Sequence, residues 1–553
     1  MGYPEGPRTG RPASIGKRGM ISTSHQLASA AGHAAMRGGG SAVDAAIAAN
    51  AVLCVVYPHM AGLGGDAFWL IHDPADAGVY ALNASGPSAA GASIAYYRNH
   101  GCEKAIPGRG ALAALTVPGA VDGWREMHRH YGRLPWEELF TDAIAYARDG
   151  FAVARSLAYW TARDAALLGQ YPPTATIYLP GNAAPRPGAA LRNPALADTF
   201  ERIARNGARQ GFYEGETAQA ICNALGPKGS PLTAEDFANY RAEWVSPIST
   251  DYRGYTVYEC PPNTQGFAAL QILNLIEGYD VAAWGDWSVD YYHHMAEAVK
   301  LAFADRNAWL TDPNFLDIPL DRLLDKNYAR ERRRLIDAEH AMDMERVKPG
   351  VPAGSFASGP VVRGDTCYFC AVDTSGLAVS VIQSIYEDFG SVDTAGDTGV
   401  ILHNRGSFFS LDHDHPNRLE PGKRTFHTLI PAMLFRGDQP YLVFGSMGGE
   451  GQPQTHAALI TRIVDFGYDV QQAIEAPRWL MGRAWGTKTQ ELSLEGRIGD
   501  PVVDALLRRG HPTRQVADWS ESMGHAQAIR IHPDTGFLEG GADPRGDGAA
   551  IGY

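Results

Sequence analysis

Basic charge, cysteine and long apolar runs are all scarce in this chain of 553 residues. Its formal net charge of −13 argues against nucleic acid or an anionic membrane as the main partner, because phosphates attract a basic face. Six cysteines in so long a chain do not make a disulfide scaffold. The longest apolar stretch, "DAAIAANAVLCVVYP", is too short to span a membrane and predicts a buried helix. The N-terminus lacks the apolar segment of a secretory signal, so we expect a cytoplasmic protein.

The rest of the composition is that of a folded globular protein. Hydrophobic residues make up 45% and charged residues 20%, which is the usual balance. The 62 glycines and 35 prolines are scattered rather than periodic, so they predict many tight turns and not collagen or a disordered tract. The length suffices for several average domains or one large enzyme core.

The pattern along the chain predicts four regions. Residues 1–18 read as a flexible terminus, 19–336 as a mostly helical body, 337–365 as a mobile linker rich in Gly, Pro and Ser, and 366–553 as a strand-rich part. The body opens with two Ala-rich helices joined at "RGGGS", with Ser41 capping the second. Paired strands follow at "GGDAFWLIHDP" and "GVYALNASGPS". In the last region, "TCYFCAVD", "LAVSVIQS", "VILHNRG" and "YLVFGS" predict strands, and helices are expected near "THAALITRIVDFG" and "DVQQAIEAPRWL".

The boundary between linker and strand, "VVRGDTCYFCAVD", has two interpretations. In the first, it is a turn that leads into a hairpin. In the second, the Asp365–Thr366 bond is a cleavage site. A threonine hydroxyl is a poor nucleophile, but an N-terminal threonine carries its own base, an α-amine whose ordinary pKa is about 8. Cleavage would therefore give Thr366 both nucleophile and base on a rigid strand.

A glycine-rich turn after a strand, "LVFGSMGGEGQPQTH", is a candidate anion site. Backbone N–H groups near Gly448 and Gly449 can point at one oxyanion, as an amidase requires. A phosphate loop is disfavoured because no Lys-Ser/Thr follows. A flexible hairpin remains the alternative.

These stretches, with "GGGSAVDAAIAANAVLCVVYPHMAGLGGDAF", "HHMAEAVKLAFADRNAWLTDP", "PGKRTFHTLIPAM" and "GGADPRGDGAAIGY", follow one another in a family order. The chain resembles the gamma-glutamyltranspeptidase family of N-terminal nucleophile hydrolases over almost its whole length. The resemblance implies an α+β fold, a four-layer αββα sandwich built jointly by two autoprocessed subunits, 1–365 and 366–553. It implies that Thr366 is the nucleophile, that the Ser384 hydroxyl supports its amine, and that Gly448 and Gly449 supply oxyanion N–H groups. It implies no cofactor and no metal, and it allows a homodimer of the two-subunit unit.

The chain departs from this family where the family binds the glutamyl group. The arginine expected near "LNASGPSAAG" is absent, and the pocket Asn corresponds to Tyr386. The Gln and Asp that help to hold the α-amino group correspond to Arg405 and Phe408. The paired serines correspond to His427 and Thr428. An Asp replaced by Phe cannot pair with an ammonium, whereas a gained Arg can bind a carboxylate bidentately.

We therefore expect an amidohydrolase for a small amide whose acyl group bears a carboxylate and no α-amino group, similar to the oxamate amidohydrolase members of the family. The alternatives are a gamma-glutamyl hydrolase or transpeptidase with a rebuilt pocket, a cephalosporin acylase-like enzyme, an uncleaved scaffold without activity, and a metal hydrolase. An ion pair with an acidic neighbour is the structural alternative for Arg405, and a hydrogen-bonded core histidine is the alternative for His427.

Three other motifs predict structure rather than chemistry. "SLDHDHPN" (Asp412 to His415) predicts a polar turn, because ligands so tightly spaced seldom converge on one metal. Cys367 and Cys370 should point to opposite faces of a strand. "GLGGD" at 62–66 is a tight turn near the site and not a dinucleotide fingerprint, because no strand–GxGxxG–helix follows.

Overall fold

The computed structural model describes residues 11–352, 365–482 and 489–553. Two seven-stranded antiparallel sheets form its centre. The first has the order β1 (Ser14–Gly16), β18 (Leu538–Ala542), β17 (Ala526–Ile531), β13 (Gln439–Ser446), β12 (Ala432–Arg436), β9 (Tyr255–Glu259), β8 (Ile248–Tyr252). The second has the order β19 (Ala549–Gly552), β2 (Met20–Thr23), β10 (Asp365–Val372), β11 (Ala378–Tyr386), β3 (Asp66–Asp73), β4 (Gly78–Ala84), β7 (Glu243–Val245).

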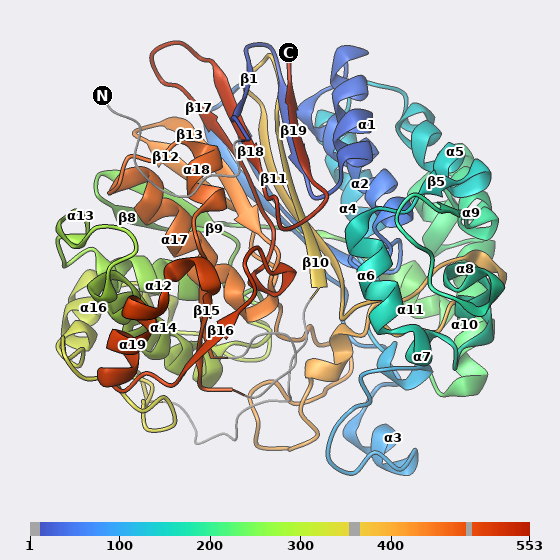
Figure 1. Ribbon diagram of the computed structural model, residues 1–553. Helices are drawn as coiled ribbons and strands as arrows, with labels where there is room; N and C mark the ends of the chain where they lie inside the picture. Colours follow the sequence, from blue (N-terminus) through green and yellow to red (C-terminus); the bar gives the residue numbers. More distant parts are fainter. Residues whose placement is uncertain (1–10, 353–364, 483–488) are drawn as a thin grey trace.

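The two sheets face each other and helices cover both outer faces (Figure 1). Side chains such as Phe68, Tyr368 and Val443 fill the space between the sheets. The second sheet is covered by α1 (Gln26–Arg37), α2 (Ala42–Val56), α4 (Ala120–Tyr131), α5 (Thr141–Asp149) and α9 (Pro194–Ala208). The first sheet is covered by α12 (Gly266–Ile276), α14 (Val289–Trp309) and α17 (Gln452–Val464). The predicted four-layer αββα sandwich is confirmed.

The Ala-rich start of the chain folds as predicted. Ser41 caps α2, and Asp44 completes the capping box by accepting from the Ser41 N–H. All fifteen residues of α2 are buried. A Cβ on Gly32 of α1 would lie 2.3 Å from the Ile21 side chain, so small residues are what allow α1 to pack closely on the sheet. No helix within the described ranges is long and apolar enough to cross a membrane.

One expectation about strands is wrong. "VILHNRG" forms only isolated bridges, Thr394 to Ile401 and Gly64 to Leu402, and then a 3-10 turn over Arg405–Phe408. No sheet edge is free there, because β11 already pairs with β10 on one side and β3 on the other. The first part of the chain contains helices α1 to α16, and it also contributes seven strands to the two sheets. Each sheet thus combines strands from both sides of the Asp365–Thr366 bond.

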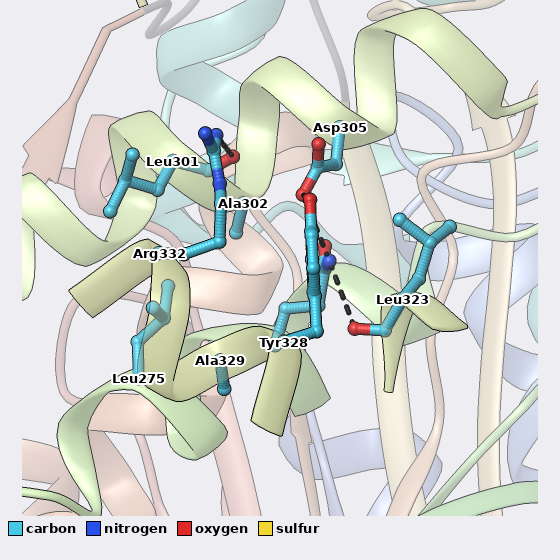
Figure 2. Close-up of a pocket in the computed structure, with 9 residues that line it drawn as sticks. Leu275, Leu301, Ala302, Asp305, Leu323, Tyr328, Ala329 and Arg332 are labelled. Atoms are coloured by element: carbon cyan, nitrogen blue, oxygen red, sulfur yellow. Dashed lines mark hydrogen bonds between the residues drawn. The ribbon is translucent and has the colours of Figure 1, made fainter. Parts of the chain in front are cut away.

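The predicted linker falls partly outside the described residues, which resume at 365. Its described portion, 337–352, is irregular chain fixed to α14 and its neighbours. The Gly350 N–H donates to Asp305 (2.8 Å), and Arg332 donates to the Lys348 carbonyl (2.8 Å). Asp305 and Arg332 also line a small cavity with Tyr328 (Figure 2). Its volume of about 10 Å³ admits one water at most, so this cavity is part of the anchor and not a substrate site.

Candidate active site

Thr366 lies at the start of β10, on the face that looks into the sandwich. Its hydroxyl donates to Ser384 Oγ (3.2 Å) on the neighbouring strand β11. Ser384 Oγ also accepts from the Tyr386 N–H (2.7 Å). In the register of the sheet, Cys367 pairs with Gln383, and Ser384 pairs with Asp66 on β3. Thr366, Ser384 and Asp66 therefore stand in a row across three adjacent strands, all buried.

Tyr386 ends β11 in a left-handed backbone conformation (φ +79°), which turns the chain out of the sheet. Its ring lies 4.8 Å from the ring of Phe408. The guanidinium of Arg405 sits over Tyr386, 4.1 Å from the ring centroid, and 5.1 Å from that of Phe408. Arg405 Nη1 donates to Thr428 Oγ1 (3.3 Å). The structure thus brings together four of the five residues that replace the glutamyl clamp.

Arg405 differs from the other large arginines of the interior. Four arginines are among the largest fully buried side chains. Three of them each pair with a carboxylate: Arg306 with Glu450, Arg462 with Asp286, and Arg545 with Glu495. In the described part of the chain Arg405 has no such partner, and its Nε and Nη2 have no hydrogen bond. Burial lowers the pKa of Arg405 to about 10, which leaves it charged at neutral pH.

His427, the fifth replacement, is held by an aspartate that sequence reasoning passed over. Its Nε2 lies 3.0 Å from Asp66 Oδ2, and its Nδ1 is buried with no partner among the described residues. Asp66 Oδ1 accepts the N–H groups of Gly86 (3.2 Å) and Gly119 (3.1 Å). Burial raises the pKa of Asp66 to about 7, opposed by the charge of Arg405. Burial, and then the Arg405 charge, hold the pKa of His427 well below its ordinary value.

Gly448 and Gly449 follow β13, at φ values of +134° and +55° that favour glycine. Neither N–H donates to another group within the described ranges. The Gly449 carbonyl accepts from Gln265 Nε2 (3.0 Å), which also donates to the Thr428 carbonyl (2.9 Å). Gln265 Oε1 in turn accepts from Arg306 (2.8 Å). One side chain therefore links the glycine turn to Thr428, which contacts Arg405.

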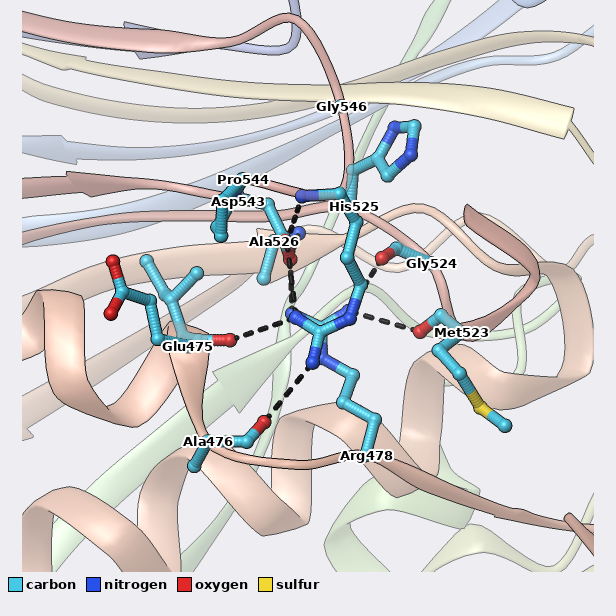
Figure 3. Close-up of polar contacts among 12 residues, drawn as sticks. Glu475, Ala476, Arg478, Met523, Gly524, His525, Ala526, Asp543, Pro544 and Gly546 are labelled. Carbon is cyan, nitrogen blue, oxygen red and sulfur yellow. Dashed lines mark hydrogen bonds and ion pairs between the residues drawn. The ribbon is translucent and has the colours of Figure 1, made fainter. Parts of the chain in front are cut away.

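A buried ion pair holds the chain next to this turn, and Figure 3 shows its two residues, Arg478 and Asp543. Arg478 pairs with Asp543 and donates to the carbonyls of Met523 (3.0 Å) and Gly524 (2.8 Å). The next carbonyl, that of His525, accepts the N–H of Met447 (2.9 Å), immediately before Gly448. Arg478 and Asp543 thereby fix the chain that packs against the glycine turn.

The structure also locates the other residues that bear on the sequence predictions. Asp365 is the first residue of β10, where its backbone pairs with Tyr386. Cys367 packs towards the helices and Cys370 between the sheets, so they face opposite sides as predicted. Asp412 accepts the N–H of Asp414 (3.0 Å) within a turn. The sequence places Asp66 at the junction of a tight turn and a strand and gives it no role in the site; in the structure it is the first residue of β3. Gln265 carried no recognisable sequence signal, and Arg306 lies in a run quoted for the family resemblance but was not singled out.

Comparison with known proteins gives matches along nearly the whole chain. A family model described as gamma-glutamyltranspeptidase matches residues 28–553. The Glutathione hydrolase-like YwrD proenzyme of Bacillus subtilis (strain 168) is 47% identical over 97% of this chain and 99% of its own length. The Oxamate amidohydrolase proenzyme of Klebsiella pneumoniae is 42% identical over 98% of this chain and 99% of its own. The crystal structure of cephalosporin acylase from Bacillus halodurans matches with a TM-score of 0.90 at 38% identity, over 100% of this chain and 98% of that one.

Proposed function

The chain belongs to the gamma-glutamyltranspeptidase family of amide-cleaving enzymes, and on that premise we propose that it hydrolyses a small amide whose acyl group bears a carboxylate, as oxamate does. Its similarity to proenzymes supports self-processing into two subunits. We place the cut at Asp365–Thr366, so that Thr366 becomes the amino terminus of the small subunit. Hydrolysis of that bond leaves a carboxyl group on Asp365 and an amine on Thr366.

The proposed reaction then runs through an acyl-enzyme. The α-amine of Thr366 takes the proton of Oγ1, and Oγ1 attacks the amide carbonyl. The N–H groups of Gly448 and Gly449 stabilise the oxyanion. Collapse breaks the C–N bond, the leaving nitrogen takes the proton from the Thr366 amine, and an ester on Oγ1 remains. Water, deprotonated by the same amine, hydrolyses the ester and releases the acid. Ser384, which accepts from the Thr366 hydroxyl, orients the nucleophile.

The choice of substrate rests on Nε and Nη2 of Arg405, which have no hydrogen-bond partner in the described residues. Nε and Nη2 form the side of a guanidinium that binds a carboxylate through two parallel hydrogen bonds. Arg545 uses this edge on Glu495, at 2.6 and 2.7 Å. The same edge of Arg405 is buried and has no partner in the described residues. A buried charge without a counterion is costly, so an anionic ligand is the natural occupant.

The names of the relatives indicate different acyl groups, and a panel of substrates distinguishes between them. Oxamate, a gamma-glutamyl anilide and a glutaryl amide represent the oxamate amidohydrolase, glutathione hydrolase and acylase alternatives. We expect oxamate to give the highest kcat/KM. Tyr386 and Phe408, whose rings contact the Arg405 guanidinium, carry no acidic group that could hold an α-ammonium. Preference for the anilide or the glutaryl amide would contradict the proposed substrate.

The proposed nucleophile has its own test. Thr366→Ala should leave a single uncut chain of 59.6 kDa with no turnover, whereas the native protein should give two fragments under denaturing mass spectrometry, the smaller one beginning at Thr366. Cleavage or activity in Thr366→Ala would refute the assignment. A native protein that stays intact would favour the scaffold alternative for this chain.

A further inference from the structure

Beside the unpartnered donors of Arg405 lies an unpartnered acceptor. Asp66 is surrounded by donors: two backbone N–H groups on Oδ1 and the His427 ring on Oδ2. A carboxylate in such surroundings accepts hydrogen bonds, so the proton of the neutral His427 ring lies on Nε2. The other nitrogen, Nδ1, then carries a lone pair, and it is buried without a partner in the described residues.

The position of this nitrogen is fixed relative to the reacting groups. Asp66 stands directly beside Ser384 in the sheet, in the row that begins with Thr366. The His427 backbone N–H donates to the Asn263 carbonyl (2.8 Å), and its carbonyl accepts from the Gln265 N–H (3.1 Å). Gln265 also holds Gly449, and Thr428, next in the chain, holds Arg405. Nδ1 therefore belongs to the same rigid assembly as the nucleophile and the carboxylate receptor.

We propose that Asp66 is a specificity-determining positioning residue, which fixes His427 so that Nδ1 accepts a hydrogen bond from the scissile amide N–H of a substrate held by Arg405. The inference rests on the proposed function and extends it from the acyl group to the leaving group. It also accounts for product release. Hydrolysis of oxamate replaces the amide nitrogen, which has N–H groups, by a carboxylate oxygen, which has none. The lone pair of Nδ1 attracts the amide N–H of the substrate and repels the carboxylate oxygen of the product.

The substitution Asp66→Asn should reverse this preference. The two backbone N–H groups that point at Oδ1 require the amide carbonyl oxygen there, so the amide nitrogen takes the place of Oδ2 and donates to His427 Nε2. The ring proton must then move to Nδ1, which becomes a donor. Oxamate and oxalate are nearly equal in size and differ in the group that faces Nδ1, so they are the probes.

Steady-state kinetics of the processed enzyme give the readout, with oxamate as substrate and oxalate as competitive inhibitor. One hydrogen bond gained or lost corresponds to about tenfold in each constant. We expect Asp66→Asn to raise the KM of oxamate and to lower the Ki of oxalate. Glu259→Gln is the matched control, because Glu259 forms a buried pair with His456 (2.8 Å) and, in the described residues, has no hydrogen bond to Asp66 or His427. It should leave the ratio of KM to Ki unchanged.

Nitrogen-15 NMR of histidine-labelled native enzyme tests the tautomer of His427 directly. The variant His427→Gln is needed only to identify the signal. At about pH 8, where Asp66 is ionised, an unprotonated Nδ1 supports the inference and a protonated Nδ1 overturns it. An unchanged ratio of KM to Ki in Asp66→Asn, with oxamate still hydrolysed, overturns it as well and leaves the proposed function standing. If oxamate is neither hydrolysed nor bound by native enzyme, the proposed function fails instead, and the NMR signal alone still decides the tautomer.

Discussion

Replacing Arg405 by Gln should separate a carboxylate receptor from a structural arginine. Its free edge offers a ligand two charge-assisted hydrogen bonds, each worth about 1.5–3 kcal/mol. Glutamine restores one neutral hydrogen bond of about 1 kcal/mol, so the net loss is about 3 kcal/mol, or about 150-fold in kcat/KM. We expect this loss for oxamate, and a far smaller one for a neutral amide of similar size.

The same substitution should not destabilise the protein. The side chain of Arg405 makes one hydrogen bond and two ring contacts, while its charge is buried without an ion pair in the described residues. Removing such a charge offsets the lost contacts, so the free energy of unfolding should stay within about 1 kcal/mol of the native value. Arg462→Gln is the control, because Arg462 pairs with Asp286 (3.2 Å). It should destabilise by about 3 kcal/mol, with no change in preference between the two amides.

Both assays are needed to interpret the result. Kinetics on the two amides measure recognition, and urea unfolding monitored by fluorescence measures stability. Equal losses of kcat/KM on the charged and the neutral amide would refute the receptor role. A stability loss as large as that of Arg462→Gln would show that Arg405 has a structural partner instead.

Two further predictions concern the assembly around Arg405. Gln265→Leu removes the contacts to the Gly449 and Thr428 carbonyls, so kcat should fall about tenfold from a loosened glycine turn. Gln219→Leu is the control and should leave kcat unchanged, because Gln219 is exposed on α10 (Glu216–Leu225) and bonds to Asn223. The pH dependence of the kinetics tests Asp66. Burial raises the pKa of Asp66 to about 7, so its carboxylate is protonated as the pH falls. It then no longer holds the ring proton of His427 on Nε2. The groups that face Asp66 are Arg405, Arg424, His403, His427, Tyr213 and Tyr240. The arginines stay charged and the others neutral, while the proposed Thr366 α-amine, with an ordinary pKa of about 8, titrates in the same range. The ratio of oxamate KM to oxalate Ki should rise between about pH 8 and pH 6 in the native enzyme and not in Asp66→Asn, which keeps the amine. A flat native ratio, or an equal rise in the variant, would contradict this.

The sequence predicted the fold best where local signals, such as helix caps, agreed with the order of the motifs along the chain. Ser41 and the alanines around it predicted α1 and α2, and motifs in family order predicted the sandwich. "VILHNRG" misled because its apolar residues are buried without entering a ladder. Gln265 and Arg306 could not be found from sequence, because their role depends on contacts with residues more than 140 positions away. Asp66 was missed for the same reason, since His427 lies 361 positions further on.

The position of the proposed cut explains how an amino terminus can form inside a finished core. Strands β10 and β11 follow Asp365–Thr366, yet they lie between β2 and β3, which precede it. Cutting the chain after the first residue of β10 therefore removes no partner of this ladder beyond Asp365 itself. Asp66 and Gln265 come from the first piece, whereas Thr366, Arg405 and His427 come from the second. The site is complete only while both pieces stay paired, so selection for activity is also selection for the sheet that joins them.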